Sequence, residues 1–150
     1  MKIIKILIAI FLIVGCAPTP QYRGQLIIQN CTENAISVQS NLACPNGDYA
    51  ANVSIAPGKT TEIAATATYP EDTAITIDKF FTNHQDAAVT VTATIDGHQS
   101  TRTWKYADRN SDKKHLFDLN DCQRESGEDA RKNFTYINYI FMIHEEDLKD

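Results

Sequence analysis

The sequence predicts an all-β fold, most simply an antiparallel β-sandwich of the Ig-like or a similar type with about eight or nine strands. Apolar and polar residues alternate with a period of two along most of the chain. Turn dipeptides separate the alternating runs, and helical periodicity is almost absent. A length of 150 residues, 43% of them apolar and 22% charged, fits one globular domain. A small closed barrel is the alternative arrangement of the same strands.

The first two strands are short runs on either side of a polar turn. Residues 26–30 and 36–42 alternate apolar and polar side chains, and residues 30–34 between them are polar. This pattern predicts a hairpin formed by the two runs.

Pro57-Gly58 separates the next two runs and is typical of a type II turn. Residues 53–55 precede this turn and residues 63–67 follow it, each with the alternation of a strand. Residues 75–77 predict one further short strand.

The clearest hairpin spans residues 88–106. Its first strand places apolar residues on one face and threonines on the other, and Asp96-Gly97 is a preferred two-residue hairpin turn. Trp104 and Tyr106 share a face of the return strand, where we expect core positions rather than a sugar-stacking platform.

Two weaker signals follow the hairpin. Residues 116–119 predict a brief strand. Ser126, with Asp129 three residues later, resembles a helix N-cap and predicts one or two helical turns before Asn133.

Residues 133–143 form a long run rich in aromatic and branched side chains, apolar on nearly both faces. Such a strand is either central and covered on both sides or docks a partner. We favour the buried strand. In the alternative, Tyr136, Tyr139 and Phe141 are the first candidates for a partner surface.

Charge and motifs argue against nucleic-acid binding and catalysis. The net charge is −5, whereas a nucleic-acid-binding surface needs a basic patch. The chain contains no GxSxG, P-loop, GxGxxG or HExxH motif. Residues 108–112 match the first half of a calcium loop, but Lys113 and Leu119 stand where that loop requires Gly and Glu. We therefore interpret them as a polar turn and expect no metal site, no cofactor and no enzymatic activity.

The N-terminus has the pattern of an export signal. Lys2 and Lys5 precede the unbroken apolar residues 6–14, a run too short to span a bilayer. The run ends in Ile13-Val14-Gly15-Cys16, which resembles the lipobox of bacterial lipoproteins.

The resemblance implies cleavage between Gly15 and Cys16 and attachment of lipid to the Cys16 thiol. It divides the chain into a signal peptide (1–15), a lipidated cysteine with a short Pro-containing tether (16–24) and a β-sandwich domain (25–150). Ala17 after the cysteine resembles the outer-membrane class of lipoproteins. The implied location is therefore the bacterial cell envelope, most simply the outer membrane facing the periplasm.

These features favour a non-catalytic binding or accessory module held at the membrane by covalent lipid, with a protein or cell-wall partner. Loss of Lys2 and Lys5 leaves 12 basic and 19 acidic residues, a net charge of −7. This charge would suit a basic partner, so a periplasmic inhibitor or immunity-type lipoprotein against a secreted wall-degrading enzyme is the alternative. An envelope hydrolase is less favoured because no nucleophile and base stand out.

Export also favours disulfide formation among Cys31, Cys44 and Cys122. In the predicted hairpin, Cys31 and Cys44 lie at opposite ends, roughly 20 Å apart along the strand. A disulfide requires Cα atoms within about 7 Å. Cys44–Cys122 and Cys31–Cys122 remain, and we predict the former.

Overall fold

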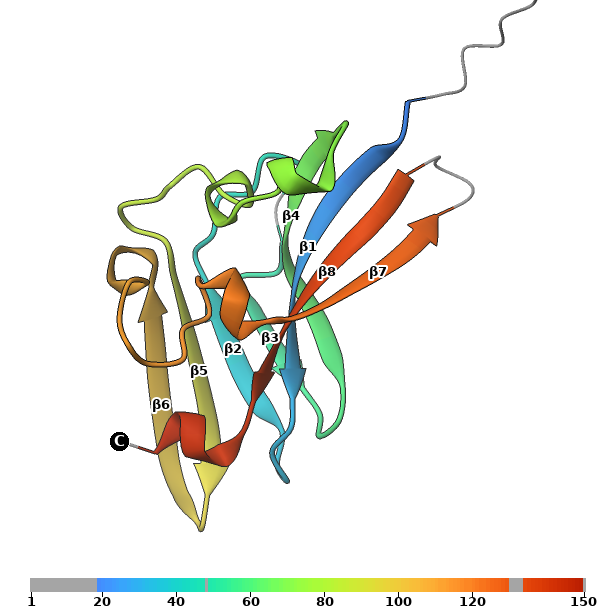
Figure 1. Cartoon of the computed structure of the whole chain (residues 1–150). Coiled ribbons are helices and arrows are strands. Elements are labelled where there is room, and N and C mark those ends of the chain that lie inside the picture. Colours follow the sequence, from blue (N-terminus) through green and yellow to red (C-terminus); the bar gives the residue numbers. More distant parts are fainter. Residues whose placement is uncertain (1–18, 48, 130–133, 150) are drawn as a thin grey trace, which may run out of the picture.

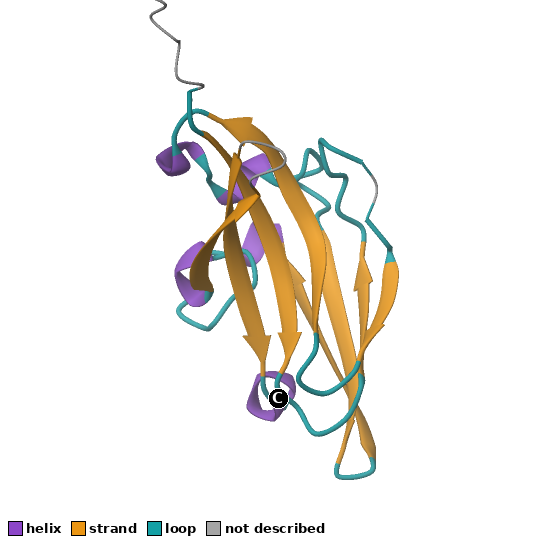
Figure 2. Ribbon diagram, turned by 90° about the vertical axis from the view of Figure 1, so that its right-hand side faces the viewer, coloured by secondary structure: helices purple, strands orange, loops and turns teal. Residues whose placement is uncertain are grey.

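The computed structural model describes residues 19–47, 49–129 and 134–149 and consists of two four-stranded sheets (Figure 1). Sheet A has the order β4-β1-β8-β7 and sheet B the order β3-β2-β5-β6. The strands are β1 (Gln21–Asn30), β2 (Ile36–Ser40), β3 (Asn52–Ile55), β4 (Thr60–Tyr69), β5 (Ala88–Ile95), β6 (His98–Lys105), β7 (Gln123–Asp129) and β8 (Phe134–Ile143). Only short 3₁₀ helices accompany them in these residues, so the predicted all-β sandwich is confirmed (Figure 2).

One strand pair departs from the predicted antiparallel pattern. β1 and β8 run parallel at the centre of sheet A, in register from Gln21 opposite Phe134 to Asn30 opposite Ile143. The other strand pairs are antiparallel. The first and last strands of the domain therefore lie side by side. The predicted tether is also too long, because residues 21–24 already belong to β1.

The hairpin of β5 and β6 is confirmed. Asp96 and Gly97 adopt φ angles of 52° and 79°, as a type I′ turn requires at both central positions. On the outer face, hydroxyl pairs such as Thr90 and Thr103, with oxygens 2.9 Å apart, link the two strands. Trp104 points inward and is buried, as predicted.

The predicted hairpin of residues 26–30 with residues 36–42 is wrong, because β1 belongs to sheet A and β2 to sheet B. Buried Asn30 explains the crossing between them. Its amide nitrogen donates to the carbonyls of Asn34 and Ile55, and its amide oxygen accepts from both the backbone N–H and the hydroxyl of Thr32. The polar segment thus forms its own closed turn and carries the chain to the other sheet.

The turn at Pro57-Gly58 is confirmed, but it too connects the two sheets. Gly58 has a φ of 70°, and the Lys59 N–H donates to the Ala56 carbonyl over 3.1 Å. β3 before this turn pairs with β2, whereas β4 after it pairs with β1.

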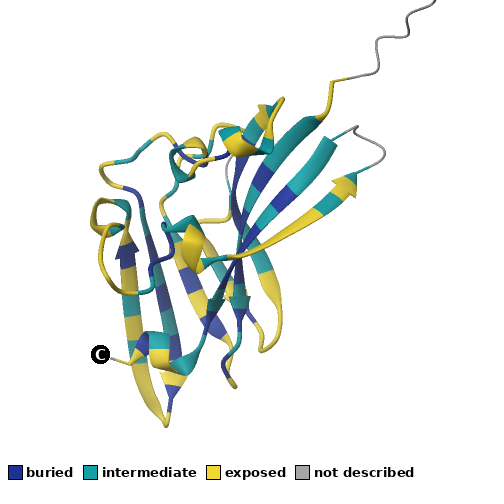
Figure 3. Cartoon of the chain, viewed as in Figure 1, coloured by how far each residue is buried: buried dark blue, intermediate teal, exposed yellow. Residues whose placement is uncertain are grey.

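Three local predictions are wrong. Residues 75–77 do not form a strand: residues 75 and 76 link the 3₁₀ helix η1 (Asp72–Ala74) to the 3₁₀ helix η2 (Ile77–Lys79), and residue 77 begins η2. Residues 116–119 form a loop that leads into η4 (Leu119–Asp121). Ser126 does not cap a helix, because its segment is edge strand β7, exposed along most of its length (Figure 3). Backbone pairing with β8 outweighs the local capping signal there.

Large aromatic side chains join the two sheets into one core. The largest fully buried ones are Trp104, Phe80, Phe81, Phe117 and Phe141. They meet edge-on rather than stacked, the geometry that aromatic quadrupoles favour.

Of the run predicted as a central strand, residues 133–143, the structure describes residues 134–143, and these form β8 between β1 and β7, which confirms the central position. Tyr139 and Phe141 are 6% and 0% exposed. The alternative of a partner surface is therefore wrong for both, since inward-facing side chains of a central strand cannot reach a partner. Tyr136 alternates with them and is half-buried on the outer face.

Candidate functional site

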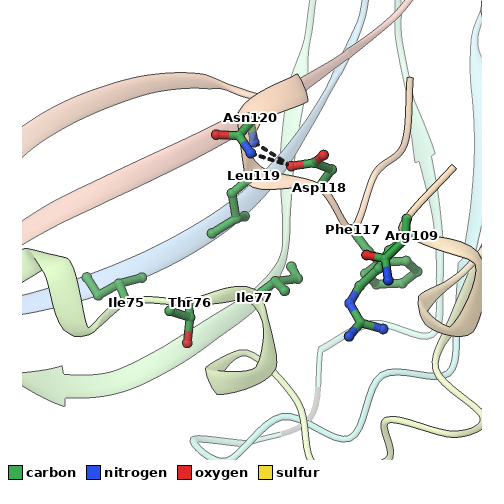
Figure 4. Close-up of a pocket in the computed structure, with 9 residues that line it drawn as sticks. Ile75, Thr76, Ile77, Arg109, Phe117, Asp118, Leu119 and Asn120 are labelled. Atoms are coloured by element: carbon green, nitrogen blue, oxygen red, sulfur yellow. Dashed lines mark hydrogen bonds between the residues drawn. The ribbon is translucent and has the colours of Figure 1, made fainter. Parts of the chain in front are cut away.

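One cavity of the described structure lies where the segment around η2 faces the segment that leads into η4. Its volume is about 370 Å³. The lining comprises apolar side chains, one guanidinium, one carboxylate and several neutral polar groups, from Ile75, Thr76, Ile77, Arg109, Asn110, Phe117, Asp118, Leu119 and Asn120. We call it the η2–η4 cleft. Figure 4 shows Leu119 reaching toward the side of the cleft that holds Ile75 and Ile77.

The floor of the η2–η4 cleft is an extension of the core. Ile75 and Phe117 are buried core residues, and Ile77 and Leu119 pack against the core while remaining partly exposed. The local chain explains this placement, because each 3₁₀ turn directs one apolar residue inward and leaves its polar neighbours outside. An apolar floor with polar groups at its margin is typical of a binding site.

Arg109 forms one side of the cleft and is held in place. Its guanidinium carbon lies 3.9 Å from the centroid of the Tyr106 ring, and its Nη1 donates to the Tyr106 carbonyl over 3.1 Å. His84 stacks on the same ring, with centroids 5.3 Å apart. Arg109 belongs to the segment that resembles a calcium loop, and in the described residues no group of His, Cys, Asp or Glu side chains could hold a metal ion.

The carboxylates near the cleft accept hydrogen bonds from residues of their own loop. Asp118 accepts from the backbone N–H and the side-chain amide of Asn120, both at 2.9 Å (Figure 4). Asp121 accepts from the His115 N–H over 2.6 Å. Burial lowers the pKa of the His115 imidazole, whose Nδ1 accepts from the Phe117 N–H. These contacts hold the loop together and leave a cleft suited to binding by shape and hydrogen bonds.

A second polar cluster, on the outer face of sheet A, is also structural. The Tyr49 hydroxyl donates to one oxygen of Glu62, and the Gln25 amide donates to the other, both over 2.5 Å. Burial and the hydrogen bond to Glu62 raise the pKa of Tyr49 above its ordinary value. The neutral phenol thus ties the loop before β3 to sheet A.

The predicted Cys44–Cys122 disulfide is not present in the structure, and none of the three described cysteines forms one. Cys44 and Cys122 both pack against the core, and Cys31 follows directly after β1. The predicted hairpin, which would hold Cys31 and Cys44 far apart, does not exist, so the distance argument against a Cys31–Cys44 disulfide is wrong as well. Burial raises the pKa of the Cys122 thiol to about 12, which keeps it protonated and unreactive at neutral pH.

The lipidation site, Cys16, and the cleavage position after Gly15 lie outside the described residues. Of the residues predicted as a partner surface, only Tyr136 is positioned for contact. The η2–η4 cleft was not found by sequence reasoning. Its only signal was the apolar spacing of Ile75 and Ile77, which also fits a strand.

In the described part of the chain, no helix is both long and apolar enough to cross a bilayer. No protein-family model, no curated protein and no solved structure matches the chain.

Proposed function

We propose that the protein is a lipid-anchored, non-catalytic binding module of the bacterial cell envelope, attached to a membrane through Cys16. The observation that carries this proposal is where the folded domain begins. β1 starts at Gln21, five residues after Cys16, and the core is filled by residues from Leu26 to Leu148. The core of the described residues thus comes from the part of the chain that a cut after Gly15 would leave, which supports the proposal.

The η2–η4 cleft supports binding rather than catalysis. The Arg109 guanidinium stacks on the Tyr106 ring, and the Asp118 carboxylate accepts a hydrogen bond from the Asn120 side-chain amide, so both charged groups already have partners within the fold. General acid–base chemistry instead needs a titratable pair within reach of a substrate. The apolar floor with its hydrogen-bonding margin fits a peptide segment or loop of a partner protein.

The anchor is tested by Cys16→Ser in cells supplied with labelled palmitate. A hydroxyl is a poor substitute for the thiolate that accepts the lipid, so the variant should carry no label and retain its leader. Cys31→Ser is the matched control and should be labelled as strongly as the parent protein. Label on the Cys16→Ser variant would overturn the anchor.

The partner is sought by capture from detergent-solubilised envelopes, followed by mass spectrometry. Thr76→Arg places a long side chain at the exposed margin of the η2–η4 cleft and should abolish capture. Thr101→Arg, on the exposed outer face of sheet B, is the control and should preserve it. One dominant wall-degrading enzyme would favour the inhibitor alternative, which is supported by the net charge of −7 that cleavage after Gly15 would leave. Subunits of an envelope assembly would favour the accessory role.

A further inference from the structure

All four strands of sheet A have one end at the place where the chain enters the domain (Figure 1). β1 and β8 begin there, with Gln21 opposite Phe134. β4 and β7 end there, since Tyr69 lies opposite Tyr22 and Asp129 opposite Phe134. We call this the tether end of sheet A.

Aromatic side chains gather at the tether end. Phe134 and Tyr136 lie on the outer face of β8, partly exposed, with ring centroids 5.0 Å apart. Tyr22 and Tyr69 lie beside each other on the neighbouring strands, pack against the core and remain partly exposed.

The opposite end of the domain has no such side chains. Its turns, formed by residues 31–35, 56–59 and 96–97, and its C-terminal residues 144–149 contain no Phe, Tyr or Trp. The two ends therefore differ in one respect: aromatic side chains lie at the tether end and are absent from the turns of the opposite end.

The length of the chain before β1 decides which end can meet a membrane. From Cys16 to Gln21 is five residues, which reach at most about 18 Å when fully extended. β1 itself has ten residues and is about 33 Å long. A lipid on Cys16 would therefore hold the tether end close to the headgroups, and the far end could stand well away from them.

We propose that the tether end of sheet A rests on the lipid bilayer, with Phe134 and Tyr136 in the headgroup region. This inference rests on the proposed lipid anchor. Tyrosine and other aromatic side chains favour that region because their rings are apolar and the phenol remains hydrated. The net charge of the chain is negative, so the inference rests on the rings and not on attraction to anionic headgroups. The opposite end is then left accessible to a partner.

The test uses the full lipidated protein in phosphatidylcholine vesicles that contain doxyl-labelled lipid, which quenches nearby tryptophan. Phe134→Trp places the probe at the tether end, and Ala35→Trp places it at the opposite end on an exposed residue. Native Trp104 is buried and contributes the same background to both variants. Emission from Trp at position 134 should shift to the blue and be strongly quenched. Emission from Trp at position 35 should match that of the same variant in buffer without vesicles.

Each other outcome counts against the inference. Equal quenching at both positions would mean that the domain lies flat, and no quenching at either would mean that it stands off the bilayer. Mass spectrometry of the same samples distinguishes a wrong orientation from a missing lipid anchor. A lipidated chain without quenching at position 134 overturns only the orientation. A chain without lipid on Cys16 overturns the anchor and the orientation together.

Discussion

Trp104 of β6 meets Phe141 of β8 edge-on across the core, with ring centroids 5.4 Å apart and ring planes at 78°. The contact joins the edge strand of sheet B to a central strand of sheet A. Both side chains are buried. Because β6 and β8 are not consecutive in the chain, this packing contact links the two sheets at a point where no loop connects them.

Trp104→Ala should destabilise the domain by about 3–5 kcal/mol, because it removes a large buried ring and leaves a cavity. Equilibrium unfolding of residues 21–150 in urea measures this loss. Gln99→Ala, on the exposed part of the same strand, is the control and should stay within about 0.5 kcal/mol of the parent. Equal effects of the two substitutions would contradict the assignment of Trp104 to the core.

Gly24→Ala should destabilise the domain by about 1–3 kcal/mol through overpacking. A Cβ atom at this position would lie 2.7 Å from a side-chain carbon of Ile75 and 2.7 Å from one of Phe80. Gly127→Ala is a matched control, because a Cβ atom there would have no neighbour within 4 Å. Thermal melting of both variants checks the prediction, which fails if Gly24→Ala melts at the temperature of the parent.

Deletion of residues 133–150 should prevent folding. It removes β8, which pairs along its full length with β1, and with it several buried side chains that each contribute about 1.5–3 kcal/mol. Their sum is comparable with the roughly 5–15 kcal/mol by which domains are ordinarily stable, and the backbone pairing of β8 with β1 is lost as well. A cooperative melt of the truncated domain near the midpoint of the full domain would contradict the central position of β8.

The thiols of residues 21–150 should all remain reduced. Reductant should leave the melting temperature unchanged, and a thiol assay in denaturant should detect Cys31, Cys44 and Cys122 together. In the native state near pH 8, Cys122 should react far more slowly than an exposed thiol, since its pKa of about 12 leaves almost no thiolate. Loss of two titratable thiols after air-free purification would instead indicate a disulfide.

Sequence reasoning succeeded where the structure is decided locally. The β5–β6 hairpin follows from Asp96-Gly97, whose two positive φ angles define the turn, and the Pro57-Gly58 turn follows from the same kind of signal. Sequence reasoning failed where contacts with residues far away in the chain determine the local structure. The buried side chain of Asn30 bonds to Ile55, 25 residues away, and turns a predicted hairpin into a crossing between sheets.

The same limit explains the rest of the molecule. β7 is polar and has no alternation of its own, so only its pairing with β8 makes it a strand. The η2–η4 cleft joins two segments about 40 residues apart in the chain, and no local pattern brings Ile77 and Leu119 to one cavity.

The lipid anchor is tested by the mass of the N-terminal peptide from protein purified out of bacterial membranes. We predict a peptide that begins at Cys16 and carries the mass of a diacylglyceryl group, with or without a further acyl chain. A peptide that begins elsewhere, or one that contains an unmodified Cys16, would contradict it.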